Sequence, residues 1–139
     1  AAPFHLWTPD IYEGSPSNVT AFFAIVPKIA ILSILIRITF LGFYNLVFSW
    51  QELLILSSIL SIIIGTFGGL IQLKLKRLFA YSTISHIGYI LLGICSGSFA
   101  GIEASYIYIV FYIWMTIICF SILLGVYEQK NLNRLIYLY

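Results

Sequence analysis

A proline and a lysine stand together inside an apolar stretch, residues 18–40, that is long enough to cross a membrane. Lys28 lies about ten residues, or roughly 15 Å, into this stretch, where a lysine costs roughly 2.5–3.5 kcal/mol on insertion scales. We interpret Lys28 as a proton site at which desolvation is opposed by a nearby carboxylate. Pro27 would kink the helix and admit water. The alternative is a structural lysine bonded to a backbone carbonyl that the proline leaves free.

A second ionisable residue, His86, falls within another apolar stretch, residues 78–96. Histidine changes charge near neutral pH, so His86 is a candidate to exchange protons with Lys28. A histidine that merely bonds a neighbouring backbone carbonyl is an equally open interpretation.

The first seventeen residues hold three prolines, His5, Asp10 and Glu13, and they are too polar and too broken to span a membrane. Irregular backbone at membrane depth persists only where protein buries it or where it lines a wet cavity. We therefore expect residues 1–17 to form a loop and a short helix, as part of an interrupted helix. His5, Asp10 and Glu13 are candidates for a proton pathway or gate, although the two carboxylates could instead cap the helix that follows.

The composition excludes several classes of function. Hydrophobic residues make up 61% of the chain and charged residues 9%, against roughly 25% charged in soluble domains, so we predict an integral membrane protein. A net charge of +2 without a basic stripe argues against a nucleic-acid partner. Cys95 and Cys119 lie in apolar runs with no ligand spacing around them, so no metal site is expected. Without a glycine-rich phosphate motif or a CxxC, we expect no cofactor on this chain.

Four segments reach the length of about 20 apolar residues that a spanning helix needs. They are residues 18–40, 52–73, 78–96 and 103–127, followed by a tail at 128–139. The sequence thus predicts an all-α membrane bundle with short links. Gly65, Gly68 and Gly69 should let the second span approach a neighbour closely.

Charges at the ends of the spans predict the orientation. The basic residues of alternate links are Lys74, Lys76, Arg77, Lys130 and Arg134. The positive-inside rule puts them on the matrix or cytoplasmic side, where Lys74, Lys76 and Arg77 would act as interface anchors. Glu52 and Glu103 are expected to begin their helices on the opposite side, where a carboxylate complements a helix N-terminus.

Three motifs occur together: "PFHLWTPDIYEGSP", "PKIAI" and "KRLFAYSTISHIGY". With "GIEA" and "WMTI" near the last span, they extend over essentially the whole chain. In this combination the chain resembles the subunit 2 family of the proton-pumping NADH:quinone oxidoreductase, respiratory complex I. The residues between these motifs are rich in Ile, Phe and Tyr, and in this they resemble the mitochondrially encoded form of the family more than the plastid one.

The resemblance implies part of an antiporter-like bundle built from two inverted repeats, each with an interrupted helix. Residues 1–17 would be the loop and second half of the first interrupted helix, Lys28 the central lysine of the next helix, and residues 52–127 the opening helices of the second repeat. The family's other lysines and its glutamate lie on helices outside this sequence. We therefore expect either a separate polypeptide that carries the missing helices or an incompletely represented subunit.

The resemblance also implies a function. Quinone reduction elsewhere in the complex would drive proton translocation through Lys28 and His86 in a hydrated axis, with FMN, iron–sulfur clusters and quinone on other subunits. The expected partners are other membrane-arm subunits and lipids, in the mitochondrial inner membrane or, alternatively, a bacterial plasma membrane. Two rival functions are a cation/proton antiporter subunit of the same superfamily and a structural remnant that pumps nothing.

Overall fold

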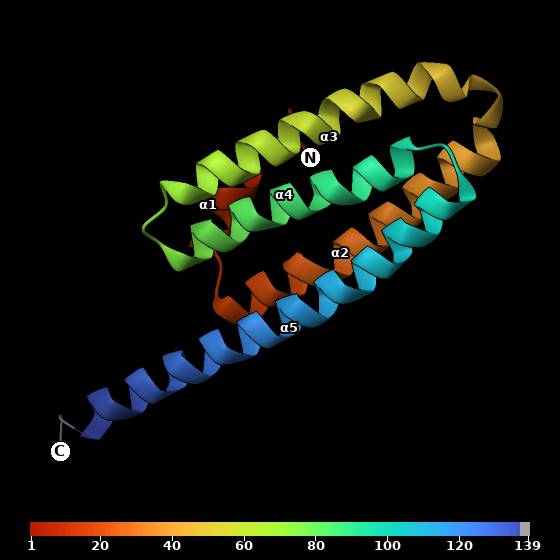
Figure 1. Ribbon diagram of the computed structural model, residues 1–139. Helices are drawn as coiled ribbons and strands as arrows, with labels where there is room; N and C mark the ends of the chain where they lie inside the picture. Colours follow the sequence, from red (N-terminus) through yellow and green to blue (C-terminus); the bar gives the residue numbers. More distant parts are fainter. Residues whose placement is uncertain (137–139) are drawn as a thin grey trace.

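The computed structural model describes the backbone of residues 1–136 and the side chains of residues 1–126. All regular elements in this part of the chain are helices (Figure 1). In chain order they are α1 (Trp7–Gly14), α2 (Ser17–Arg37), a π-helical turn (Ile38–Gly42), a 3₁₀ turn (Tyr44–Leu46), α3 (Val47–Leu70), α4 (Leu75–Cys95) and α5 (Phe99–Ile136).

Four of these helical stretches are long and apolar enough to cross a membrane. They are Ser17–Gly42, Tyr44–Leu70, Leu75–Cys95 and Phe99–Val126. The prediction of an all-α membrane bundle with four spans is therefore confirmed. The tail expected at residues 128–139, with Lys130 and Arg134, lies outside the described side chains.

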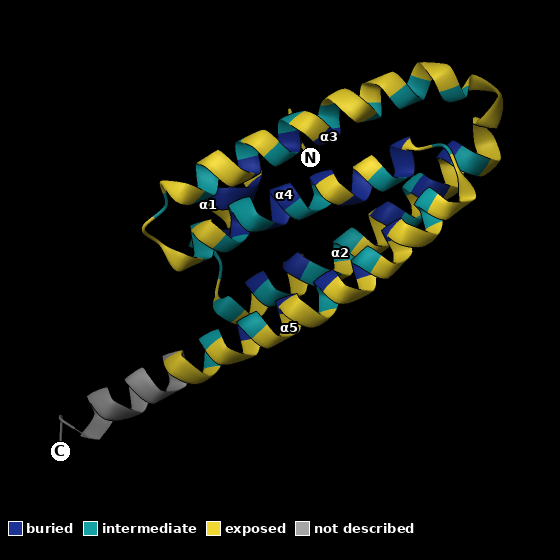
Figure 2. Cartoon of the chain, in the orientation of Figure 1, coloured by how far each residue is buried: buried dark blue, intermediate teal, exposed yellow. Residues whose placement is uncertain are grey.

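Helices α3 and α4 form one antiparallel pair, and α2 lies along α5 although the two are far apart in the sequence (Figure 1). Helix α4 contacts α1, α3 and α5. Of the residues in its most apolar 18-residue stretch 50% are buried, whereas the corresponding share in each of the other three spans is 22% or less. Figure 2 shows the consequence, since the outward faces of α3 and α5 are largely exposed. Such exposed apolar faces suit contact with lipid or with further helices.

Two helix starts differ from the expectation. Glu52 and Glu103 were expected to begin their helices, but neither lies in the first turn of α3 or α5. Apolar and aromatic residues upstream, from Val47 and from Phe99, join these helices instead. The carboxylates therefore do not complement the helix N-termini as predicted.

Small residues bring α3 and α4 together. A Cβ atom at Gly65 would lie 2.6 Å from the backbone nitrogen of Ser85, and one at Gly68 would lie 2.5 Å from the ring of Tyr81. Real Cβ atoms do not approach so closely, so the predicted close approach is confirmed at both glycines. At Gly69 the nearest atom would be 3.7 Å away, which is ordinary contact.

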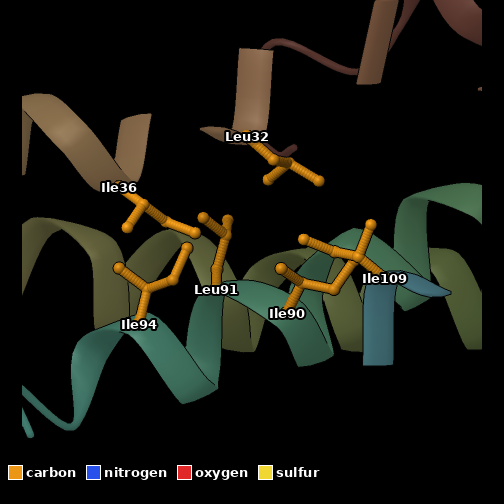
Figure 3. Close-up of a cluster of buried hydrophobic side chains, with 6 residues drawn as sticks. All are labelled: Leu32, Ile36, Ile90, Leu91, Ile94 and Ile109. Atoms are coloured by element: carbon orange, nitrogen blue, oxygen red, sulfur yellow. The ribbon is translucent and has the colours of Figure 1, made fainter. Parts of the chain in front are cut away.

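Two apolar clusters hold the remaining helices around α4. In the first, side chains of α2, α4 and α5 interdigitate (Figure 3). Its buried members are Leu32, Ile36, Ile90, Leu91, Ile94 and Ile109. The second joins α1 to the same helices through Tyr12, Ala24, Ala80 and Phe120. The short α1 is thereby fixed against the bundle, with α4 as its main neighbour.

Candidate functional site

The ammonium group of Lys28 is bound by two tyrosines from two other helices. Its Nζ donates to the hydroxyl of Tyr12 on α1 at 3.0 Å and to the hydroxyl of Tyr112 on α5 at 2.9 Å. No ion pair among the described residues includes Lys28, so the expected carboxylate partner stays a prediction. A backbone carbonyl partner, the alternative, is not found within the described part of the chain either. The partners of this nitrogen in the described part of the chain are two phenol oxygens.

A pocket of about 240 Å³ borders Lys28. Its lining is apolar apart from the lysine and the chain's first residue, and it includes Trp7, Phe23 and Pro27. Because Pro27 has no N–H, the carbonyl of Phe23 lacks its usual donor four residues along the helix. Helix α2 nevertheless continues as one helix through Pro27. Since one water occupies roughly 30 Å³ in the liquid, this pocket has room for several.

His86 on α4 forms the second half of the site. Its Nδ1 lies 2.9 Å from the hydroxyl of Tyr108 on α5, so a phenol, and not a backbone carbonyl, is its hydrogen-bond partner. The His86 ring also packs against the ring of Tyr112, with centroids 5.3 Å apart. Two pockets of about 240 and 200 Å³ border both His86 and Tyr112. Tyr112 therefore bonds Lys28 and contacts His86, which links the two predicted proton residues through one side chain.

Sequence reasoning missed all three tyrosines, because it assigned tyrosines to packing and to the interfacial belt. One signal was available for Tyr108 and Tyr112, which are four residues apart and therefore lie on the same face of their span. Another was available for Tyr12, which belongs to the polar motif segment before α2. Neither signal identifies the group that the hydroxyl binds.

Asp10 and Glu13 belong to a separate cluster of ion pairs. Asp10 lies 3.0 Å from the Arg77 guanidinium, and Glu13 pairs with both Lys74 and Arg77. The alternative that these carboxylates cap α2 is wrong, since Pro16 is the N-cap residue and no side chain caps it. The hydrogen bond from Lys74 lowers the pKa of Glu13, and the charges of Arg77 and Lys74 lower it further.

The basic link between α3 and α4 therefore binds α1. Lys76 adds a hydrogen bond of 2.8 Å from its Nζ to the backbone carbonyl of Ser15. These contacts of Lys74, Lys76 and Arg77 tie the link to the segment that carries Tyr12. Their orientation toward the matrix and their role as interface anchors stay predictions.

His5 stands apart from both clusters. Its side chain is buried, and its Nδ1 has no hydrogen-bond partner among the residues that the structure describes. The structure thus joins Lys28 and His86 in one site through tyrosines, places Asp10 and Glu13 on the basic link, and joins His5 to neither.

The whole chain, residues 1–139, matches the family described as NADH:quinone oxidoreductase/Mrp antiporter, transmembrane. The chain belongs to this family. Its relatives include "NADH-quinone oxidoreductase subunit N" of Pelagibacter ubique, 50% identical over 124 residues, which are 89% of this chain and 26% of that protein. "NADH-quinone oxidoreductase subunit N 1" of Rhizobium meliloti is 46% identical over 131 residues, 94% of this chain and 27% of the relative.

A third relative has comparable similarity. "NADH-ubiquinone oxidoreductase chain 2" of Marchantia polymorpha is 45% identical over 130 residues, which cover 94% of this chain and 26% of the relative. The chain therefore spans about a quarter of the length of the curated relatives that it matches. These matches confirm the resemblance to complex I subunits that the motifs indicated, and the four apolar helices fit a membrane subunit of that kind.

Proposed function

We propose that this chain forms part of a proton-translocating membrane subunit of NADH:quinone oxidoreductase, with Lys28 as a group that takes up and releases protons. The observation that carries the proposal is the Lys28 ammonium, which lies within a span, is bound by two phenols and borders a pocket of about 240 Å³. An ionisable residue at membrane depth is costly and is by default a functional candidate. The names of the relatives supply the complex in which it would act.

In this proposal the Lys28 ammonium passes a proton to the Tyr112 hydroxyl, which releases its own proton to water in the pockets that border Tyr112 and His86, and that water protonates a ring nitrogen of His86. Proton transfer requires groups within hydrogen-bond reach or one water apart, which is why the pockets matter. Lys28 is then neutral and can accept the next proton from water on its own side. The chain supplies no redox chemistry in this scheme. FMN, iron–sulfur clusters and quinone would belong to other parts of the complex, whose turnover drives the cycle.

A cation/proton antiporter is the second candidate, because the family description names Mrp antiporters beside the oxidoreductase. The two functions differ in their partners. Copurification of the full subunit with flavin and iron–sulfur subunits supports the first function, whereas ion exchange without such partners supports the second.

We further propose that other helices of the same subunit, on the same or a separate polypeptide, cover the outer side of α1. The support is that Phe4, Leu6 and Trp7 are 83%, 76% and 59% exposed, while the Nδ1 of the neighbouring His5 is buried without a described partner. Membrane-arm subunits and lipids would cover the remaining apolar faces. The mitochondrial inner membrane, or a bacterial plasma membrane, is the proposed location.

The proposal is tested by Lys28→Met in the full-length subunit, assembled into the intact complex and reconstituted into liposomes. We expect assembly to persist and the number of protons moved per electron to fall, because methionine cannot carry a proton. Arg37→Met is the matched control, since it removes a cation from the same helix at an exposed position, and it should pump as the unmodified complex does. A full proton-to-electron ratio in Lys28→Met, as a structural remnant would give, contradicts the proposal.

A further inference from the structure

Two phenols hold a single nitrogen in the interior of the bundle. Lys28 belongs to α2, Tyr12 to α1 and Tyr112 to α5, so three helices converge on the Nζ atom. Both tyrosines are buried, with exposed fractions of 1% and 6%. Tyr12 is fixed by its apolar cluster, and Tyr112 by its ring contact with His86. Neither hydroxyl can leave the nitrogen without a change in this packing.

The chemistry of a phenol differs from that of the partners usually found beside a lysine. A carboxylate and a backbone carbonyl only accept hydrogen bonds, whereas a phenol both donates and accepts. An ammonium has three N–H donors and can give one to each phenol oxygen, as the two distances show. A neutral amine has two N–H donors and one lone pair, so it can donate to one phenol and accept from the other. Only hydrogen atoms need to move between the two arrangements.

We propose that Tyr12 and Tyr112 are positioning residues, a phenol clamp, that hold the Lys28 nitrogen in place both with and without its extra proton. The inference rests on the proposed function, in which Lys28 alternates between these two states. A carboxylate in the same place would form an ion pair that holds the proton on the lysine. The phenols favour the charged form less strongly than an ion pair would, because their oxygens are neutral, and they leave the third N–H of the ammonium for a partner in the adjoining pocket.

The clamp also explains why the short helix α1 is built into the bundle. Helix α1 is the only contribution of the polar segment 1–16 to regular structure in the described chain, and its buried residues are Thr8, Pro9 and Tyr12. Of these, Tyr12 accepts the hydrogen bond from Lys28. Segment 1–16 thus places one phenol, that of Tyr12, beside the lysine of the following helix.

The test compares Tyr12→Phe and Tyr112→Phe in the full-length subunit of the intact complex, reconstituted into liposomes. Each change removes one oxygen atom and leaves the ring in place. We expect normal assembly and normal packing, but a loss of pumping of roughly tenfold in the double variant, because hydrogen bonds to charged groups are the stronger class. The pH at which pumping is half-maximal should move by about one unit, which corresponds to a tenfold change in proton affinity. A merely structural tyrosine would not move this pH profile.

Tyr106→Phe is the matched control. Tyr106 lies on the same helix as Tyr112, is exposed, and has no described side-chain hydrogen bond, so its variant should keep both the pumping ratio and the pH profile. Should Tyr12→Phe fail to assemble, Tyr112→Phe on a different helix decides the question alone.

The outcomes separate the clamp from the proposed function. If Lys28→Met loses pumping while the phenylalanine variants keep the ratio and the profile of the unmodified complex, the clamp is wrong and the proposed function stands. If Lys28→Met itself pumps fully, the proposed function fails and the clamp fails with it. Loss of pumping in Lys28→Met together with a displaced pH profile in the phenylalanine variants supports both.

Discussion

Two lysines of this chain, Lys28 and Lys74, have opposite surroundings. Lys28 lies within a span and binds the hydroxyls of Tyr12 and Tyr112. Lys74 lies in the link between α3 and α4, has a side chain that is 68% exposed, and pairs with Glu13. The same ammonium group thus has neutral partners in the interior and a charged partner at the surface.

The contrast follows from the cost of charge in the two places. At the surface, water and salt screen an ion pair, so the pair contributes little to stability and hardly restrains its two side chains. In the interior, a carboxylate beside Lys28 would be attracted strongly and would hold it in the charged form. The neutral phenols of Tyr12 and Tyr112 bind the Lys28 nitrogen without so strong a preference for its charged form. Helix α1 joins the two regions, since Tyr12 faces the interior and Glu13, the next residue, faces the link.

The first prediction removes the contrast by giving the interior lysine a charged partner. Tyr112→Glu places a carboxylate on the α5 side of Lys28, and we expect the resulting ion pair to abolish pumping, because the lysine keeps its proton. Tyr112→Gln is the control, because glutamine has nearly the same size as glutamate but carries no charge. Proton-to-electron ratios of the two assembled complexes measure the difference. Equal pumping by both variants would show that the charge of the partner is irrelevant.

A smaller effect is expected when the surface partners are removed. The double variant Lys74→Met with Arg77→Met deletes the cations that bind Asp10 and Glu13. Exposed ion pairs contribute little, and the apolar cluster around Tyr12 remains, so we expect pumping within about twofold of the unmodified complex.

In limited proteolysis, the same double variant should be cleaved near residues 15–17 faster than the unmodified complex, because α1 is held less firmly. A complete loss of pumping without loss of assembly would mean that the surface ion pairs, and not the packing of Tyr12, position the interior site.

The sequence predicted the parts of this structure that depend on local composition. Membrane spans can be predicted because about 20 apolar residues in a row are needed to cross a membrane. A single lysine or histidine within such a run is easily identified as a candidate functional residue. The ends of the helices were predicted less accurately. Glu52 and Glu103 were assigned to helix starts from charge alone, whereas apolar residues upstream extend both helices.

The partners of the ionisable residues were not predictable in the same way. Tyr12 and Tyr112 lie 16 and 84 residues from Lys28 in the sequence, and Glu13 lies 61 residues from Lys74. Such pairs form only when helices pack, and a single sequence shows no packing. Glu13 and Asp10 were therefore given a local role as caps, which needs no tertiary structure, although their partners belong to a distant link.

The smallest effect is expected from acid at the surface pairs. The pKa of Glu13 is lowered in the folded chain, so its contribution to the docking of α1 is complete above the ordinary glutamate value of 4.5 and is lost as the pH falls through the lowered value. Hydrogen exchange of α1 amides in the intact complex, corrected for intrinsic rates and followed from pH 6 to about pH 3, should show protection that declines only at the acid end. In Glu13→Gln this part of the decline should disappear, because glutamine has no charge to lose. Glu103→Gln, which has no described ion pair, should behave as the unmodified complex does. An unchanged acid decline in Glu13→Gln would mean that the ion pairs of Glu13 have no part in holding α1, and hence none in placing Tyr12 beside Lys28.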